Sequence, residues 1–326
     1  MKFSLRLNND LAVPEYVAMA REAEAAGFDQ FWVSNDLFLR AVPVILTAVA
    51  LATERIAIGT CVLNPYTMHP AEIAMLAATL DEVSGGRFNL GIAAGGSELL
   101  KWVGITHDAP LAATRRAIAQ INATLTGTPA DEWTSEAYLR FPARRRVPIY
   151  LGAMGPRMLR LAGEVADGVL PLLFPPEHFA TVRPLVEEGA AAAYRSMETL
   201  DLAACIWVSL SDDYAAAEAV LRDKIAYYGA GFGPLIFDRL GVTKEDFAPI
   251  EHAIQTERDP LKARALVNDK MLRIGIVGTS ANLIERLETL VAMGARHLSF
   301  GPPLGPDPIE AVRIIGQTVI PHFASR

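Results

Sequence analysis

Short apolar segments alternate with longer segments of helical periodicity, and this alternation restricts the fold more than any other feature of the chain. The apolar segments are nearly continuous in hydrophobic character, which is typical of parallel strands covered on both faces. Their number predicts an α/β fold, a (β/α)8 TIM barrel, although an open doubly wound sheet has the same alternation. The eight predicted strands are Lys2–Leu7, Gln30–Ser34, Arg55–Leu63, Arg87–Ala93, Val147–Ala153, Gly168–Leu173, Asp201–Leu210 and Ala295–Gly301.

Two stretches are longer than a minimal barrel needs. One spans about 95–146, after the fourth predicted strand. The other spans about 227–277, before the last barrel helix, and its pattern is mostly helical. We expect one TIM-barrel domain over residues 1–326, because barrels of this size are common. The two stretches are then insertions near the mouth of the barrel, or part of a dimer surface.

Composition excludes several kinds of partner. The formal net charge of −7 gives no general attraction to nucleic acid or to an anionic membrane. Two cysteines far apart, Cys61 and Cys205, do not make a disulfide framework, so a reducing cytoplasm is expected. The N-terminal segment has no signal-like apolar core, and no apolar run reaches the roughly 18 residues of a membrane span. A small-molecule substrate is the expected partner.

The stretch GTCVLNPYTMHP, residues 59–70, joins the third predicted strand to the helix that follows it. In a barrel of this kind, catalytic groups lie where strands end and helices begin. Asn-Pro is a common start of a turn, so a purely structural turn remains an alternative. The two prolines nevertheless fix the loop, and the small residues Thr60 and Cys61 would let a flat ring approach the strand closely.

Polar residues also follow the second and fourth predicted strands. Asn35 and Asp36 come after the second strand, but both are preferred N-cap residues, so the sequence alone favours capping of the next helix. The segment GIAAGGSE after the fourth strand keeps the backbone open to a ligand near Gly95. Glu98 is the first acid in that loop; it could donate a proton, or simply lie favourably in the first turn of a helix.

After the fifth predicted strand, the segment GAMGPRM spans Gly152 to Met158. Glycines stand directly before a helix with Pro156 in its first turn, so free backbone N–H groups there favour an anion such as a phosphate. Arg157 could contribute or could face solvent. The run Arg144–Arg146 is typical of a solvated loop, with binding of an acidic cofactor tail as the alternative.

Other catalytic constellations are absent from the sequence. The six histidines show neither HxH nor HExxH spacing, so no metal site is predicted. There is no GxSxG elbow for a serine nucleophile. A lysine for Schiff-base chemistry at a strand end is not found either, which argues against a lyase.

Two long motifs identify a family. GTCVLNPYTMHPAEIAMLAATLDEVSGGRFNLGIAAG and PIYLGAMGPRMLRLAGEVADGVLP resemble the luciferase-like flavin- and F420-dependent oxidoreductases. Within that family the chain is most similar to the methylenetetrahydromethanopterin reductase branch. The resemblance implies a luciferase-like TIM barrel that holds a flavin or deazaflavin in its mouth.

The resemblance also implies roles for individual residues. A non-prolyl cis peptide between Cys61 and Val62 would press against the central ring of the cofactor, with Thr60 beside it. Asn35 and Asn64 would contact the cofactor. Its phosphate would lie at the loop formed by Gly152, Ala153, Met154, Gly155 and Pro156.

Two positions depart from the family pattern. Many F420-using relatives have Asp-His where this chain has Asn35-Asp36, and many have an acid where it has Gly96. We therefore expect Asp36 or Glu98 to exchange protons. The predicted function is hydride transfer between coenzyme F420 and a small substrate, a methylene-tetrahydropterin C1 carrier being the first candidate. The alternatives are an FMN-dependent monooxygenase and a cofactor-binding barrel without turnover; a homodimer or higher homo-oligomer is expected.

Overall fold

The computed structural model describes residues 1–324, except for the side chain of Glu98. Its strands are β1 Lys2–Leu7, β2 Gln30–Val33, β3 Ala57–Thr60, β4 Phe88–Ile92, β5 Ile149–Gly152, β6 Gly168–Leu170, β7 Asp201–Leu210, β8 Ile276–Gly278 and β9 His297–Leu304. Parallel pairing joins each strand from β1 to β7 to the next one along the chain. The strand order is β6-β5-β4-β3-β2-β1-β9-β7-β8, with β6 also paired to β7. Strands β1–β7 and β9 thus close into the eight-stranded ring of a TIM barrel, which confirms the predicted fold.

The strands begin and end close to the predicted residues, with one addition. The three-residue strand β8 pairs with the end of β7, where Val208 lies opposite Ile276. It lies at the end of the stretch predicted as the second insertion. That stretch is mostly helical, as expected, since it contains α9 to α12.

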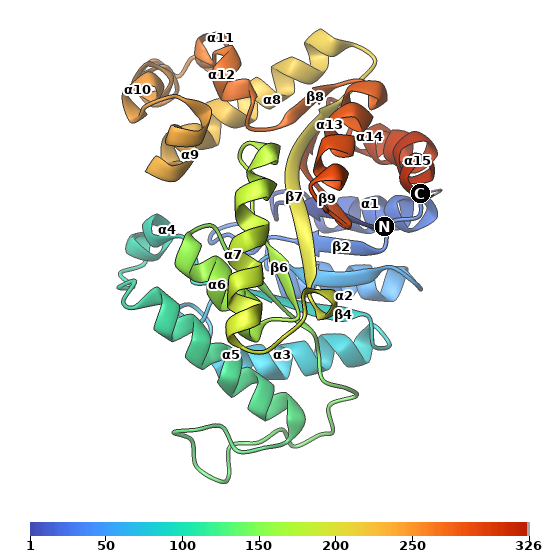
Figure 1. The fold of residues 1–326 in the computed structure, drawn as a ribbon, viewed down its shortest axis with the longest axis vertical. Coiled ribbons are helices and arrows are strands. Elements are labelled where there is room, and N and C mark those ends of the chain that lie inside the picture. Colours follow the sequence, from blue (N-terminus) through green and yellow to red (C-terminus); the bar gives the residue numbers. More distant parts are fainter. Residues whose placement is uncertain (325–326) are drawn as a thin grey trace. The chain divides into compact units, whose positions relative to one another are not determined.

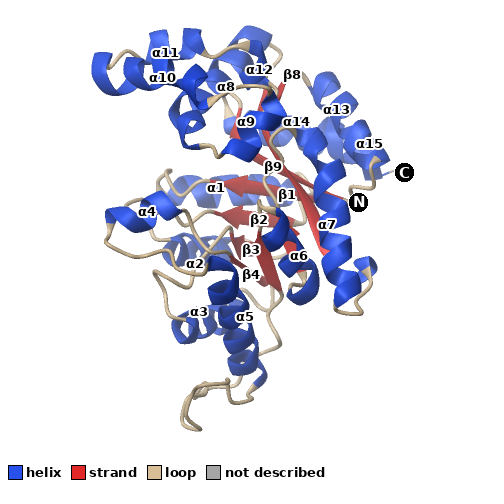
Figure 2. Ribbon diagram, turned by 60° about the vertical axis from the view of Figure 1, so that its left-hand side comes forward, coloured by secondary structure: helices blue, strands red, loops and turns tan. Residues whose placement is uncertain are grey.

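Two compact units make up the described chain. The first contains residues 4–171 and 182–203, and its helices are α1 Val13–Ala25, α2 Val42–Ala52, α3 Pro70–Val83, α4 Ser97–Trp102, α5 Pro110–Thr126, α6 Pro156–Val165 and most of α7 Phe179–Ala192, with the short turn η2 Met197–Thr199. In Figures 1 and 2, α2, α3 and α5 run along the outside of β2, β3 and β4.

Residues 1–3, 172–181 and 204–324 form the second unit. The ring of Trp207, in β7, meets the ring of Phe174 edge to face, with the centroids 4.7 Å apart. The helical elements of this unit are η1 Pro176–His178, α8 Tyr214–Tyr228, η3 Gly229–Gly231, α9 Pro234–Leu240, α10 Lys244–His252, η4 Ala253–Glu257, α11 Pro260–Leu266, α12 Asp269–Leu272, α13 Ser280–Ala292, α14 Pro308–Ile314, η5 Ile315–Val319 and α15 Ile320–Ala324.

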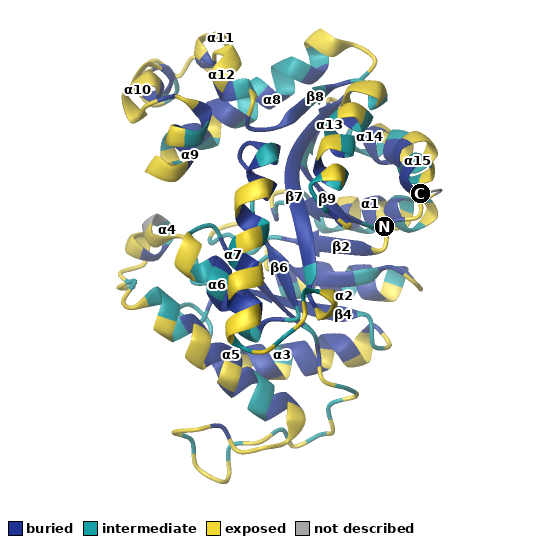
Figure 3. Cartoon of the chain, in the orientation of Figure 1, coloured by how far each residue is buried: buried dark blue, intermediate teal, exposed yellow. Residues whose placement is uncertain are grey.

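Burial follows the predicted pattern of apolar strands behind amphipathic helices. Figure 3 shows the strands as buried and the outward faces of the surrounding helices as exposed. Every residue of β2 and β4 is buried, in agreement with strands covered on both faces. Within residues 1–324, no helix is both long and apolar enough to cross a membrane.

Candidate active site

The ends of β3 and β4 are joined more closely than ordinary strand pairing requires. The hydroxyl of Thr60 donates to the carbonyl of Gly91 at 2.8 Å and accepts from the Gly91 N–H at 2.9 Å. A Cβ atom on Gly91 would lie 1.9 Å from the carbonyl oxygen of Thr60, so only glycine fits there. Thr60 is fully buried. Its side chain therefore supports the next two residues and is not itself exposed to a ligand.

The peptide bond between Cys61 and Val62 is cis, as the family resemblance implied, and this prediction is confirmed. Hydrogen bonds hold the backbone on both sides of this bond. The N–H of Cys61 donates to the carbonyl of Val33 at 2.8 Å, and the N–H of Leu63 donates to the carbonyl of Gly91 at 2.9 Å. The Cys61–Val62 unit is thus fixed between the ends of β2 and β4.

The loop after Val62 is organised by the side chain of Asn64, which is 9% exposed. Its Oδ1 accepts from the N–H groups of Tyr66 at 3.1 Å and Thr67 at 3.0 Å, and from the Thr67 hydroxyl at 3.1 Å. These bonds use only the oxygen of the carboxamide. The Nδ2 group of Asn64 is therefore available to donate to a ligand.

Glycines bring the loops after β3, β4 and β5 together. Gly95 has φ +81°, and a Cβ on it would lie 3.1 Å from Cγ of Asn64. A Cβ on Gly152 would lie 3.1 Å from Val62 and 3.2 Å from Ala93. Because these two glycines lack side chains, residues predicted separately from three strand ends meet in one place.

The loop after β5 leads into α6 without a side-chain cap. Gly155 is the N-cap residue, and a Cβ placed on it would have no atom within 4 Å. In the first turn Pro156 has no N–H, and the N–H of Met158 donates to the carbonyl of Gly155 at 3.0 Å. The backbone N–H of Arg157 is thus the first-turn group left to donate to a phosphate. Of the loop residues predicted to bind the cofactor, Ala153 is buried, and Met154 and Gly155 are half-buried.

Asn35 and Asp36 do not cap the following helix, and that interpretation was wrong. Helix α2 begins at Val42 with Ala41 as its N-cap residue, which lies beyond both of them in the chain. The loop is instead held by the buried side chain of Asn9. Its Nδ2 donates to the carbonyl of Asp36 at 3.0 Å, and its Oδ1 accepts from the Asp36 N–H at 3.2 Å.

This loop starts beside the other site residues, because Val33 at the end of β2 lies opposite Thr60 in β3. Sequence reasoning missed Asn9, although the polar run after the first predicted strand was a signal. The second predicted proton donor, Glu98, has a side chain outside the described residues. Gly96 is the N-cap residue of α4, which contains Glu98.

The arginine run does not bind an acidic cofactor tail. Arg145 donates to Oδ1 of the buried Asp81 at 2.9 Å and to the carbonyl of Phe88 at 2.8 Å, and Arg146 pairs with Asp167 at 2.9 Å. Phe88 is the first residue of β4, so these contacts lie at the end of the strand opposite to the site. That alternative interpretation of the run was wrong.

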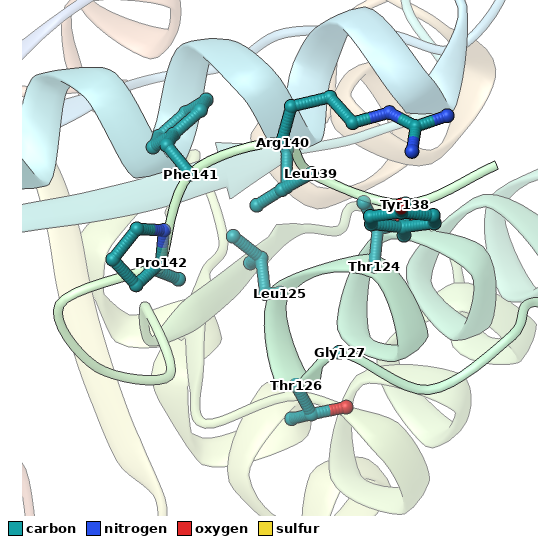
Figure 4. A pocket seen from close by; sticks show the side chains of 10 residues that line it. Thr124, Leu125, Thr126, Gly127, Tyr138, Leu139, Arg140, Phe141 and Pro142 are labelled. Atoms are coloured by element: carbon teal, nitrogen blue, oxygen red, sulfur yellow. The ribbon is translucent and has the colours of Figure 1, made fainter. Parts of the chain in front are cut away.

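A surface pocket of about 560 Å³ lies elsewhere, beside the last turn of α5. Figure 4 shows Leu125 of α5 pointing toward the segment from Tyr138 to Pro142. The guanidinium of Arg140 stacks on the ring of Tyr138 at 3.9 Å. None of the candidate site residues lines this pocket. Among the described residues there is also no group of three or more His, Cys, Asp or Glu side chains placed to hold a metal ion.

Comparisons with known proteins agree with this geometry. Residues 3–297 match the family described as Luciferase-like monooxygenase. The chain is 33% identical to a 5,10-methylenetetrahydromethanopterin reductase of Archaeoglobus fulgidus over 99% of this chain and 100% of that protein. It is 30% identical to an F420-dependent glucose-6-phosphate dehydrogenase of Beutenbergia cavernae, with 93% and 91% of the two chains covered.

A solved structure of a related enzyme has the same fold. The coenzyme F420 dependent tetrahydromethanopterin reductase from Methanopyrus kandleri superposes with a TM-score of 0.88 at 29% identity, and 99% of each chain is covered. Since sequence and structure both match over nearly their full length, the chain belongs to the luciferase-like monooxygenase family.

Proposed function

We propose that this protein is an oxidoreductase that transfers a hydride between coenzyme F420 and a methylene-tetrahydropterin C1 carrier. The observation that carries the proposal is the full-length similarity to reductases of that substrate class, in sequence and in structure. The relationship to a dehydrogenase of glucose 6-phosphate supports the cofactor independently of the substrate. The assignment of F420 as cofactor therefore has support from relatives with different substrates, whereas the assignment of a pterin substrate has support from the reductases alone.

The residues at the strand ends fit a flat anionic cofactor. Gly95 and Gly155 leave the backbone open, and Val62 and Asn64 lie where the three loops meet. In the proposal the ring lies against Cys61 and Val62, and Asn64 donates to it through Nδ2. The uncapped first turn of α6 binds the phosphate.

The protein contributes position and electrostatics, whereas the bound deazaflavin supplies or accepts the hydride. Asn64 cannot shift easily, because three hydrogen bonds fix its Oδ1. Two hydrogen bonds with the Asn9 side chain fix the backbone of Asp36. In the proposal, the carboxyl group of Asp36 exchanges a proton. Glu98 is proposed as the second proton-exchanging residue.

We propose further that the protein works in the cytoplasm and as a homodimer. Neither Cys61 nor Cys205 forms a disulfide, which suits a reducing compartment. The packed helices α2 and α3 expose large apolar side chains, with Leu51 74%, Val44 59% and Met75 53% exposed. Sedimentation velocity tests the dimer: Leu51→Asp should yield a monomer, and a parent protein that sediments as a monomer would contradict the proposal.

Cofactor titration decides between the two reaction classes. F420 and FMN are added separately to the purified protein, and binding is followed by fluorescence quenching. Tight binding of F420 with weak binding of FMN is expected; the reverse would overturn the proposal in favour of an FMN-dependent monooxygenase. Oxidation of reduced F420 is then followed with methylene-tetrahydromethanopterin and with methylene-tetrahydrofolate, of which at least one should react.

The proposed proton exchange is tested by Asp36→Asn and Glu98→Gln. Loss of a general acid lowers turnover by roughly a hundredfold or more, with unchanged F420 affinity. Asp10→Asn is the matched control, because Asp10 is an exposed carboxylate next to Asn9. Unchanged turnover in both site variants would remove these two residues from the mechanism.

A further inference from the structure

Tyr66, in the loop after β3, contacts a segment that follows α4. Its ring meets the ring of His107 edge to face, with the centroids 5.0 Å apart and the planes at 60°. Its hydroxyl group donates a hydrogen bond to the carbonyl of Asp108. The loop that Asn64 organises is therefore attached through Tyr66 to a segment 42 positions further along the chain.

His107 makes a second contact, with the loop after β4. Its Nε2 lies 3.1 Å from the carbonyl oxygen of Ala94, a geometry in which the ring N–H donates. Ala94 directly precedes Gly95, which packs against the side chain of Asn64. A single imidazole thus touches both loops that carry candidate cofactor contacts, one through its ring and one through its nitrogen.

The segment that carries His107 leads directly into helix α5. Ala109 is the N-cap residue of the 17-residue helix α5, with Pro110 in the first turn. Helix α5 packs along α3, which itself begins at the end of the Tyr66 loop. Because both ends of the contact rest on packed helices, the Tyr66–His107 pair can restrict the movement of the two loops between them.

We propose that Tyr66 and His107 form a latch that holds the Ala94–Gly95 backbone against Asn64 and so positions the cofactor ring. Both are positioning residues: they act through Asn64 and Gly95. The inference deepens the proposed function and rests on it for the identity of the ring. It gives a role to Tyr66, which lies within the first family motif, and adds His107, which lies outside both motifs.

The ionisation of Tyr66 agrees with this role. Burial and the negative charge of Asp108 raise the pKa of Tyr66, against an opposing effect of Arg116. The phenol is therefore protonated at neutral pH and able to donate to the Asp108 carbonyl. His107 can donate through Nε2 whether its ring is neutral or charged, so the latch does not require a particular charge on the imidazole.

Two variants of His107 test the latch. His107→Leu removes the donor, whereas His107→Gln retains an N–H group that can reach the Ala94 carbonyl. The first readout is amide hydrogen exchange of residues 94–96 and of Tyr66 and Thr67, measured on the protein without cofactor. We expect faster exchange at both loops in the leucine variant, on the order of tenfold, and exchange near the parent rate in the glutamine variant.

The second readout is F420 affinity by fluorescence quenching. Loss of one positioning hydrogen bond should weaken binding in His107→Leu by about tenfold, and His107→Gln should restore most of it. Tyr66→Phe should weaken binding less than Tyr66→Leu, because the phenylalanine keeps the ring contact with His107. Tyr194→Phe serves as the matched control, since Tyr194 is fully exposed.

The possible outcomes distinguish failure of the Tyr66–His107 latch from failure of the proposed F420 function. If the parent binds no F420 but His107→Leu still loosens both loops, the latch stands and the proposed cofactor fails. If the parent binds F420 and the leucine and glutamine variants behave alike in exchange and affinity, the latch is wrong. Circular dichroism identifies any variant that does not fold. If one of the His107 variants does not fold, the comparison of Tyr66→Phe with Tyr66→Leu tests the latch, and if one of the Tyr66 variants does not fold, the His107 variants do.

Discussion

The spacing of β3 and β4 beneath the site leads to a sharp prediction for Gly91→Ala. The added Cβ would stand 1.9 Å from the carbonyl oxygen of Thr60, a backbone atom that cannot rotate away. An ordinary carbon–oxygen contact is about 3.3 Å, so the two strands would have to separate by more than about 1 Å. The two hydrogen bonds between Thr60 and Gly91 would not survive that movement.

The loss of folding stability in Gly91→Ala follows from the steric overlap and from the lost hydrogen bonds. Overpacking of a tight interior typically costs about 1–3 kcal/mol, and each lost hydrogen bond about 1 kcal/mol. Together they amount to roughly 4 kcal/mol, which lowers the melting temperature by roughly 6 °C for a chain of this length. Cofactor affinity should fall as well, because Cys61 follows Thr60 directly.

Gly155→Ala is the matched control on the same side of the barrel. The new methyl group would have no neighbour within 4 Å, so stability should change by at most about 1 kcal/mol, the penalty for alanine at an N-cap. It should nonetheless weaken F420 binding, since the proposed phosphate site is there. Thermal melts and quenching titrations of both variants give the result. A Gly91→Ala protein that melts with the parent would refute the strand spacing on which the site depends.

Three further predictions concern side chains that stabilise the fold. Arg87→Met should destabilise the protein by about 3–5 kcal/mol in urea unfolding, because the guanidinium donates five hydrogen bonds to the ends of α2, α3 and the start of β3. Arg87→Lys should recover only part of this stability. Full recovery of stability in Arg87→Lys would contradict this account. Burial raises the pKa of Glu24, but three backbone N–H bonds outweigh it and the net pKa is lowered. Glu24→Gln should therefore lose stability at neutral pH and little in strong acid, where the parent carboxylate is itself protonated; an equal loss in both conditions would argue against it. Burial, together with the nearby charge of Arg239, lowers the pKa of His178 from 6.5 to about 4. Between these two pH values the unfolded chain therefore binds more protons than the folded protein. The free energy of unfolding should fall by about 3 kcal/mol as the pH drops from 6.5 to 4. In His178→Leu the pH dependence should flatten there, measured against His252→Leu, whose histidine is 58% exposed.

Much of the fold was predictable because its signals are local. Each of the eight apolar segments became a strand of the barrel, and the glycine and proline residues of segment 152–158 predicted the start of α6 correctly. Strand β8 was not predicted, because three residues are too few to show a periodicity. The cis bond at Cys61 was predicted only through the family motif; no composition or spacing rule points to it.

The candidate site was predictable in part. Its residues were found at four strand ends, because in a barrel of this kind those ends share one face. Asp36 was first assigned to a helix cap, since the length of the loop before α2 could not be read from the sequence. The sequence left two interpretations of the arginine run, because the buried partner of Arg145 is Asp81 in α3, 64 positions away in the chain.

The sequence by itself determined where strands and helices form, because hydrophobic periodicity is a property of neighbouring residues. Only the tertiary structure decided which loops touch. The contacts of Asn9 with Asp36, of Tyr66 with Asp108 and of Gly91 with Thr60 join residues 27 to 42 positions apart. Such contacts depend on the distance between neighbouring strand ends, and that distance is fixed only when the ring of strands has closed.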